Sequence, residues 1–181
     1  MFRFDFGDAS EDTSSPSATL PQSYTTNPPF IREIPYDPVY LPTDESPLVE
    51  ILGFRIIRSS TVSTESGESE YDLIPGKYEG GHALWESSID LCEYIVEVFG
   101  PTNGIATAVL ELGCGAGLPG IQALRLGSRT VVFSDFNEDV LSSKTWPNIV
   151  LNVPELSQRC ISCLAGDWTG LAAHFTQTAL G

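Results

Sequence analysis

The stretch VLELGCGAG, residues 109–117, constrains the fold of this 181-residue chain most strongly. It overlaps a short apolar run, residues 106–110, which is typical of a buried strand in a parallel sheet because apolar side chains face both sides. Three alternating glycines follow, and such a turn lets the backbone approach a ligand where a Cβ atom would block it. Residues 119–126 begin with proline and stop before Gly127, as helices often do. Strand, glycine turn and helix together predict a nucleotide-type ligand site at the carboxyl end of the strand.

The acid at position 111 bears on which nucleotide this turn binds. Residues 115–120 fit the dinucleotide fingerprint G-x-G-x-x-G, which is a weak signal alone. Glu111 with Gly113, Gly115 and Gly117 fits instead the first motif of S-adenosylmethionine (AdoMet) methyltransferases. A carboxylate here would repel the diphosphate of a dinucleotide but suits the cationic methionine end of AdoMet. We therefore predict AdoMet. The weaker alternatives are a dinucleotide oxidoreductase and a tight turn that binds nothing.

Two later apolar runs are predicted to be strands that end in the same way. The first, residues 129–136, ends in Asp135, about 20 residues after the glycine turn, where an acid can accept hydrogen bonds from ribose hydroxyls. The second, residues 159–164, leads into Gly166-Asp167-Trp168. An acid can accept a hydrogen bond from an adenine amino group while an aromatic ring stacks on the base. The three strand ends therefore predict one ligand crevice.

The charge of the chain limits its partners. It has 24 Asp and Glu against 9 Lys and Arg, a formal net charge of -15. A nucleic-acid-binding surface is not expected, because contacts with phosphate groups need clustered Lys and Arg side chains. A basic protein substrate is expected instead, because the acidic chain attracts positive charge. No secretory signal or long apolar span precedes the four cysteines, so we expect reduced thiols in the cytoplasm, the nucleus or both, and no membrane partner. Cys160 and Cys163 have the C-x-x-C spacing of a redox motif or of one half of a zinc site. The alternation of residue types from 159 to 164 instead favours a strand in which the cysteines are packed.

The N-terminal half divides into a tail and the start of the folded domain. Residues 1–46, rich in Pro, Ser, Thr and acids, predict a disordered or loosely draped tail, so the domain occupies residues 47–181. Residues 48–58 predict a bent strand or small hairpin that turns at Gly53, a β extension outside the main sheet.

A helix is predicted over residues 84–99, because Trp85, Ile89, Cys92, Val96 and Phe99 form one apolar stripe that would pack on the sheet. Trp85 is either part of the core or a wall of the ligand site. His82, just before this helix, is predicted to be a loop residue rather than a general base.

These features together resemble the seven-β-strand AdoMet methyltransferases, within them the family that acts on protein lysine and histidine. The closest similarity is to protein-histidine N-methyltransferases of a ribosomal large-subunit protein. The matching segments are YEGG (78–81) with LWE (84–86), LELGCGAGL (110–118), DFN (135–137), PNIVLN (147–152) and GDW (166–168).

The resemblance implies an α/β, Rossmann-like fold with a parallel sheet and flanking helices. It implies transfer of the sulfonium methyl group of AdoMet to a neutral imidazole nitrogen, which the protein aligns. It identifies no catalytic side chain and requires no metal. The residues that it assigns to AdoMet binding are Trp85, Glu86, Glu111, Gly113, Gly115, Gly117, Asp135, Phe136, Asn137, Gly166, Asp167 and Trp168.

The family pattern continues with a strand that carries an acid-and-aromatic motif, and then with further strands, none of which this chain contains. We therefore expect an incomplete sheet in which residues 106–110 form an open edge, and a chain that is inactive alone. Two alternatives stay open: a non-catalytic AdoMet-fold fragment or interaction module, and a protein-lysine methyltransferase.

Overall fold

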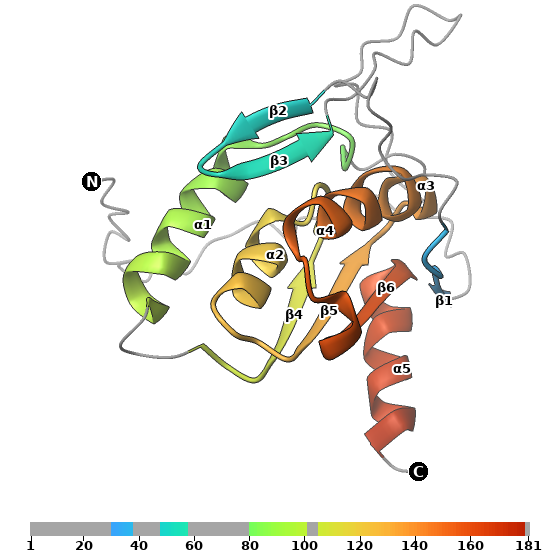
Figure 1. The fold of residues 1–181 in the computed structure, drawn as a ribbon. Helices are drawn as coiled ribbons and strands as arrows, with labels where there is room; N and C mark the ends of the chain where they lie inside the picture. Colours follow the sequence, from blue (N-terminus) through green and yellow to red (C-terminus); the bar gives the residue numbers. More distant parts are fainter. Residues whose placement is uncertain (1–29, 38–47, 58–79, 101–104, 180–181) are drawn as a thin grey trace, which may run out of the picture.

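The fold is built on a four-stranded mixed sheet (Figure 1). The computed structural model describes residues 30–37, 48–57, 80–100 and 105–179. The strand order is β1-β6-β5-β4, in which β4, β5 and β6 are parallel and β1 is antiparallel to β6. The strands of this sheet are β1 (Ile31–Glu33), β4 (Ala108–Leu112), β5 (Thr130–Asp135) and β6 (Cys160–Gly166). The predicted α/β fold with a parallel sheet and the three predicted parallel strands are thereby confirmed.

Helical segments connect these strands. They are α1 (Glu86–Phe99), α2 (Leu118–Arg125), α3 (Glu138–Val140), the π-helical η2 (Leu141–Thr145), α4 (Trp146–Asn152), the 3₁₀ turn η3 (Leu156–Gln158) and α5 (Trp168–Ala179). The segments α3, η2 and α4 follow one another without a break, so the return from β5 to β6 is a single helical path.

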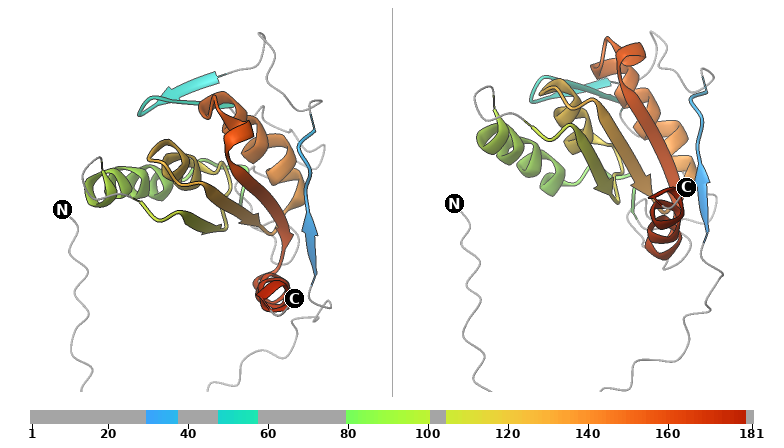
Figure 2. Two further views of the ribbon diagram at one scale, coloured as in Figure 1. Left: turned by 60° about the horizontal axis from the view of Figure 1, so that its bottom comes forward. Right: turned by 90° about the horizontal axis from the view of Figure 1, so that it is seen from below.

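The two faces of the sheet differ in their cover. Figure 2 shows α2 and α4 on the same side of the sheet, where Val131, Phe133 and Cys163 are fully buried beneath them. On the other face of β4, Leu110 and Leu112 are 43% and 50% exposed. Within the described part of the chain β4 pairs with β5 alone, as the sequence predicted for this strand.

The packing of α1 differs from the prediction. Its bounds agree with the predicted helix to within two residues, but α1 packs chiefly against α2 rather than on the sheet. Of the predicted apolar stripe only Cys92 is buried, while Val96 and Phe99 are 45% and 39% exposed. The reason is that α2 already occupies the sheet face beside β4, which leaves α1 in the next layer.

The prediction of an unstructured tail over residues 1–46 is wrong for residues 30–37. Here β1 pairs with β6 from Ile31 opposite Gly166 onward, and the Ile34 amide donates to the Cys163 carbonyl at 2.8 Å. Ile34 is buried and its carbonyl accepts from the Trp146 indole. The segment pairs with the backbone N–H and C=O groups at the free edge of β6 and buries Ile34. The free energy gained from these contacts exceeds the tendency of its polar composition to stay unstructured. Residues 1–29 and 38–46 lie outside the described residues, and the domain boundary stays a prediction.

Of the two structures predicted for residues 48–58, a bent strand or a small hairpin, the described residues 48–57 form the hairpin. It consists of β2 (Leu48–Ile51) and β3 (Phe54–Ile57). Two asparagines attach it to α4: the Asn152 side chain accepts from the Arg55 amide at 2.9 Å and the Asn148 side chain accepts from the Ile57 amide at 2.9 Å. Asn148 is fully buried and also donates to the Ala116 carbonyl, so it links the hairpin to the glycine turn.

The turn of this hairpin contains a strained residue. Leu52 has φ 50° and Gly53 has φ 73°, a conformation for which Asn-Gly is the preferred pair. Because a branched side chain disfavours this region, Leu52→Asn should raise the free energy of unfolding by about 0.5–1 kcal/mol. Urea unfolding of the two proteins measures this difference, and an unchanged or lower unfolding midpoint would contradict it.

Candidate functional site

A cavity of about 430 Å³ lies at the carboxyl ends of the three parallel strands. In an α/β sheet this edge is where ligands bind, because the loops that follow the strands converge there. The residues that line the cavity are Gly80, Gly81, Trp85, Gly113, Asp135, Phe136, Gly166, Asp167 and Trp168.

The structure brings most of the predicted AdoMet-binding residues to this cavity, and the rest lie elsewhere. Those in its wall are Trp85, Gly113, Asp135, Phe136, Gly166, Asp167 and Trp168. Glu86 is an exposed residue in the first turn of α1, and Asn137 is the N-cap of α3. Gly115 and Gly117 are not among the lining residues, although the Gly115 amide donates to Asp135. Gly80 and Gly81 were not among the predicted binding residues, although the YEGG motif pointed to them; Tyr78 and Glu79 lie outside the described residues.

Asp135 ties the second strand end to the glycine turn. One carboxylate oxygen, Oδ2, accepts from the Gly115 amide at 2.9 Å, and the other accepts from the Asn137 amide at 3.1 Å. Asp135 is 5% exposed. Burial raises the pKa of this carboxyl above its ordinary value, and the bonds from Asn137 and Gly115 offset part of the rise. Each carboxylate oxygen can accept a second hydrogen bond, so the group can serve both the turn and a ligand hydroxyl.

The glycines of the turn serve two different purposes. At Gly113, with φ 61°, an added Cβ would meet no atom within 4 Å, so this position opens into the cavity. At Gly117, with φ 77°, a Cβ would lie 3.0 Å from Thr145 and 3.2 Å from Phe133. Gly113 therefore gives a ligand access to the backbone, whereas Gly117 allows α2 to start tightly against the core.

Glu111 points away from the cavity, which corrects the predicted role. Its carboxylate accepts from the Gly120 amide in the first turn of α2 at 2.7 Å. Burial raises the pKa of Glu111 to about 8, and the bond from Gly120 offsets only part of that rise. Side chains alternate along β4, so Glu111 shares the helix-covered face with Val109 while its neighbours point the other way. Glu111 therefore joins β4 to the first turn of α2 and is not one of the residues that line the cavity.

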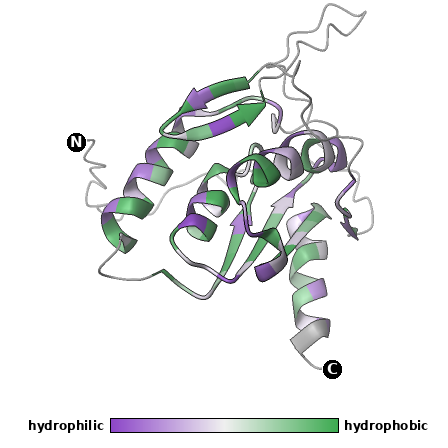
Figure 3. Cartoon of the chain, viewed as in Figure 1, coloured by the Kyte–Doolittle hydropathy of each residue, from purple (hydrophilic) through white to green (hydrophobic). Residues whose placement is uncertain are grey.

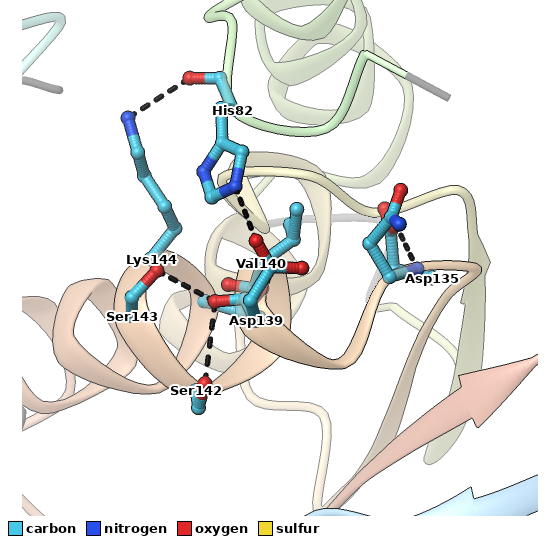
Figure 4. A network of polar contacts seen from close by, with 9 residues as sticks. His82, Asp135, Asp139, Val140, Ser142, Ser143 and Lys144 are labelled. Atoms are coloured by element: carbon cyan, nitrogen blue, oxygen red, sulfur yellow. Dashed lines mark hydrogen bonds and ion pairs between the residues drawn. The ribbon is translucent and has the colours of Figure 1, made fainter. Parts of the chain in front are cut away.

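The turn at His82 is held to the helical segments after β5 by contacts with Asp139 and Lys144 (Figure 4). The His82 ring contacts the Asp139 carboxylate at 2.7 Å, and Lys144 donates to the His82 carbonyl at 2.9 Å. The hydrogen bond from His82 lowers the pKa of Asp139. His82 lies in a turn, as predicted, and the pair holds Gly81 against the cavity. A Cβ at Gly81 would lie 2.9 Å from Val140, so no larger residue fits there.

The third strand end is shaped by β1 as well as by β6. Asp167 caps α5 by accepting from the Gly170 amide at 2.7 Å, and it accepts from the Phe30 amide at 3.1 Å. These two bonds lower the pKa of Asp167. Phe30 packs edge-on against Phe136 in the cavity wall, with ring centroids 5.8 Å apart. Phe30 was not among the predicted site residues, because it lies in the segment predicted to be a tail.

The wall of the cavity combines aromatic rings, a buried carboxylate and open glycine backbone. Two indole rings stand at its border, Trp85 at 49% and Trp168 at 67% exposure, while Asp135 lies deep in the wall. Trp85 is thereby assigned to the wall of the site rather than to the core. Aromatic faces, a buried acceptor for hydroxyl groups and an open glycine backbone fit a nucleoside-type ligand.

Comparison with known proteins identifies the family. The profile of the family described as "Lysine methyltransferase" matches residues 75–178, more than half of the chain. The chain belongs to this methyltransferase family. The matched region spans the cavity and all three parallel strands.

Several curated proteins are similar to this chain in sequence. The "Histidine protein methyltransferase 1 homolog" of Dictyostelium discoideum is 46% identical over 97 residues, which cover 54% of this chain and 30% of that protein. The rat protein of the same name is 35% identical over 170 residues, covering 81% and 46%. "Histidine protein methyltransferase 1" of Schizosaccharomyces pombe is 43% identical over 86 residues, covering 45% and 25%. The chain thus spans less than half the length of these relatives.

Membership of the family implies a methyl donor as cofactor. In the described part of the chain no helix is long and apolar enough to cross a membrane. The same residues hold no group of three or more His, Cys, Asp and Glu side chains suited to a metal ion.

Proposed function

We propose that this methyltransferase transfers a methyl group from AdoMet to a histidine side chain of a basic protein, with a ribosomal protein as the first candidate. The observation that carries the proposal is the cavity at three successive strand ends, whose lining includes Asp135 and the indoles of Trp85 and Trp168. The names of the relatives at 35–46% identity support histidine as the acceptor.

The residues around the cavity suit the three parts of AdoMet. Asp135 has lone pairs left for ribose hydroxyls, and Trp168 with Asp167 suits the adenine. Trp85 and the open backbone at Gly113 suit the methionine end. When bound, AdoMet supplies an electrophilic methyl group on its sulfonium sulfur. The contribution of the protein is to exclude water and to align the acceptor nitrogen, which accounts for a large part of such a rate enhancement.

The choice of histidine also has a chemical basis. At neutral pH a histidine side chain, with an ordinary pKa near 6.5, is largely neutral and has a free nitrogen lone pair, whereas lysine must first lose a proton. The net charge of -15 attracts a basic substrate, most strongly at low salt. Ribosomal proteins meet this requirement, and such a substrate places the enzyme in the cytoplasm, the nucleus or both.

Calorimetric titration tests the cofactor. We expect the protein to bind AdoMet and S-adenosylhomocysteine and to leave NAD unbound, because the cavity offers acceptors rather than the anion-binding groups that a diphosphate needs. Binding of NAD without binding of AdoMet would overturn the proposal.

Mass spectrometry of ribosomal proteins tests the acceptor. The predicted inactivity of the isolated 181 residues is still a prediction, so the methyl mark is compared in cells with and without the gene. Loss of a histidine methyl group on gene deletion is the expected result. Loss of a lysine methyl group with histidine methylation unchanged would instead support lysine, the second candidate, which the family description favours.

A further inference from the structure

A second cavity, of about 290 Å³, lies between the tip of the β2–β3 hairpin, α1 and α2. The residues that line it are Leu52, Phe54, Cys92, Glu93, Val96 and Gln122. It shares no lining residue with the cavity at the strand ends. In Figure 1 the hairpin lies across the end of α1, and α2 lies beside α1.

The floor of this second cavity is largely apolar. Phe54 and Cys92 are 1% and 2% exposed, and the Arg125 guanidinium stacks over the Phe54 ring at 4.7 Å. At its rim Leu52 is 51% exposed and Val96 is 45% exposed. Leu52 also has the unfavourable positive φ of the turn. An apolar side chain kept exposed in a strained turn is typical of a contact residue rather than of a residue selected for folding.

The side of α1 next to this cavity is acidic. Glu86, Asp90, Glu93 and Glu97 are all exposed, and their spacing of four, three and four residues places them on one helix face. The sequence of α1, ESSIDLCEYIVEVF, contains no lysine or arginine. Glu93 belongs both to this acidic face and to the cavity wall. Figure 3 shows the resulting alternation of hydrophilic and hydrophobic residues along α1.

We propose that this second cavity is a docking site for the protein substrate, which inserts one apolar side chain between basic residues that pair with the acidic face of α1. The inference rests on the proposed function, since it places a substrate contact away from the methyl-donor cavity. The cavity volume suits an aliphatic or methionine side chain, and the charges of α1 select lysine and arginine around it. A nucleic acid would be repelled by the same acids, and so would a second copy of a chain with net charge -15.

Fluorescence anisotropy with synthetic peptides tests the site. The probe is the labelled peptide Lys-Arg-Lys-Leu-Lys-Arg-Lys, together with versions that carry isoleucine, methionine, phenylalanine or alanine in place of leucine. We expect at least one apolar version to bind about tenfold more tightly than the alanine version, which is the effect of filling an apolar pocket with one aliphatic side chain. Added salt should weaken binding of every version.

Matched variants locate the contact. Leu52→Asn should weaken the apolar peptide at least about fivefold although it makes the hairpin turn more favourable, so loss of folding cannot explain the result. Leu48→Asn, at the other end of the hairpin, should bind as the wild type. Glu93→Lys should weaken binding, whereas Glu155→Lys, the same charge change at an exposed site on η3, should not. Equal binding of the apolar and alanine peptides, or unchanged binding by Leu52→Asn, would overturn the docking site.

Two further measurements separate this inference from the proposed function. Leu52→Asn should bind AdoMet as the wild type does, and Asp135→Ala should bind the peptide as the wild type does. Peptide binding in a protein that does not bind AdoMet would refute the proposed function and leave the docking site standing. AdoMet binding with no preference for an apolar peptide would refute the docking site alone.

Discussion

Asp135→Ala should weaken AdoMet binding by about 1.5–3 kcal/mol, the worth of a hydrogen bond to a charged group, or roughly 10- to 150-fold in Kd. The carboxylate lies in the cavity wall and holds the Gly115 and Asn137 amides, so its removal takes away a ligand contact and loosens the turn. Isothermal titration of AdoMet into both proteins measures the change.

A folding control accompanies this measurement, because Asp135 is buried. The far-UV circular dichroism of the variant should match that of the wild type at the temperature of the titration. Ser157→Ala, at an exposed position on η3, should bind AdoMet unchanged. A folded Asp135→Ala protein with wild-type affinity would show that this carboxylate is structural and not part of the binding site.

The stability of the protein should fall as the pH rises from about 5 to 8, and Glu111 should account for much of the loss. Its pKa rises from an ordinary value of 4.5 to about 8 in the folded chain. Between these values the unfolded chain releases the proton while the folded chain keeps it, so each pH unit lowers the free energy of unfolding by up to about 1.4 kcal/mol. The full effect of this residue is of the order of 3–5 kcal/mol.

Urea unfolding at several pH values, on the wild type and on Glu111→Gln, isolates this effect. Glutamine keeps an oxygen to accept from the Gly120 amide but carries no proton to lose, so its stability should depend less steeply on pH. The raised pKa of Asp135 acts in the same direction in both proteins and cancels in the comparison. Glu155→Gln, at an exposed acid, serves as the control. Parallel pH profiles for wild type and Glu111→Gln would contradict the prediction.

The position of the cavity at the strand ends was predictable because its determinants are local. Each of β4, β5 and β6 is a short apolar run that ends in glycine or an acid. In a parallel sheet such ends meet at one edge whatever the rest of the chain does. Asp135 and Trp168 could therefore be assigned to one site without knowledge of their neighbours.

The directions of individual side chains were harder to predict from the sequence. Glu111 stands in the same motif as Gly113, but the pleat of β4 turns it toward α2, and the helix amide that it meets belongs to the next element. Asn148 and Asn152 were recognisable as part of a family motif. Their use as the attachment of a separate hairpin depends on backbone groups of β3, nearly 100 residues earlier in the chain.

Local patterns of apolar residues, glycines and acids were thus sufficient for the α/β class, the three parallel strands and the edge at which the larger cavity lies. The incorporation of β1, the contact of Phe30 with the cavity wall and the exposed second cavity required the folded chain. Phe30 and Asp167 lie 137 residues apart, and a strand of three residues gains its stability from the edge that it covers rather than from its own sequence. Contacts of this kind depend on which surfaces remain uncovered after the central sheet has formed. A local sequence pattern does not contain that information.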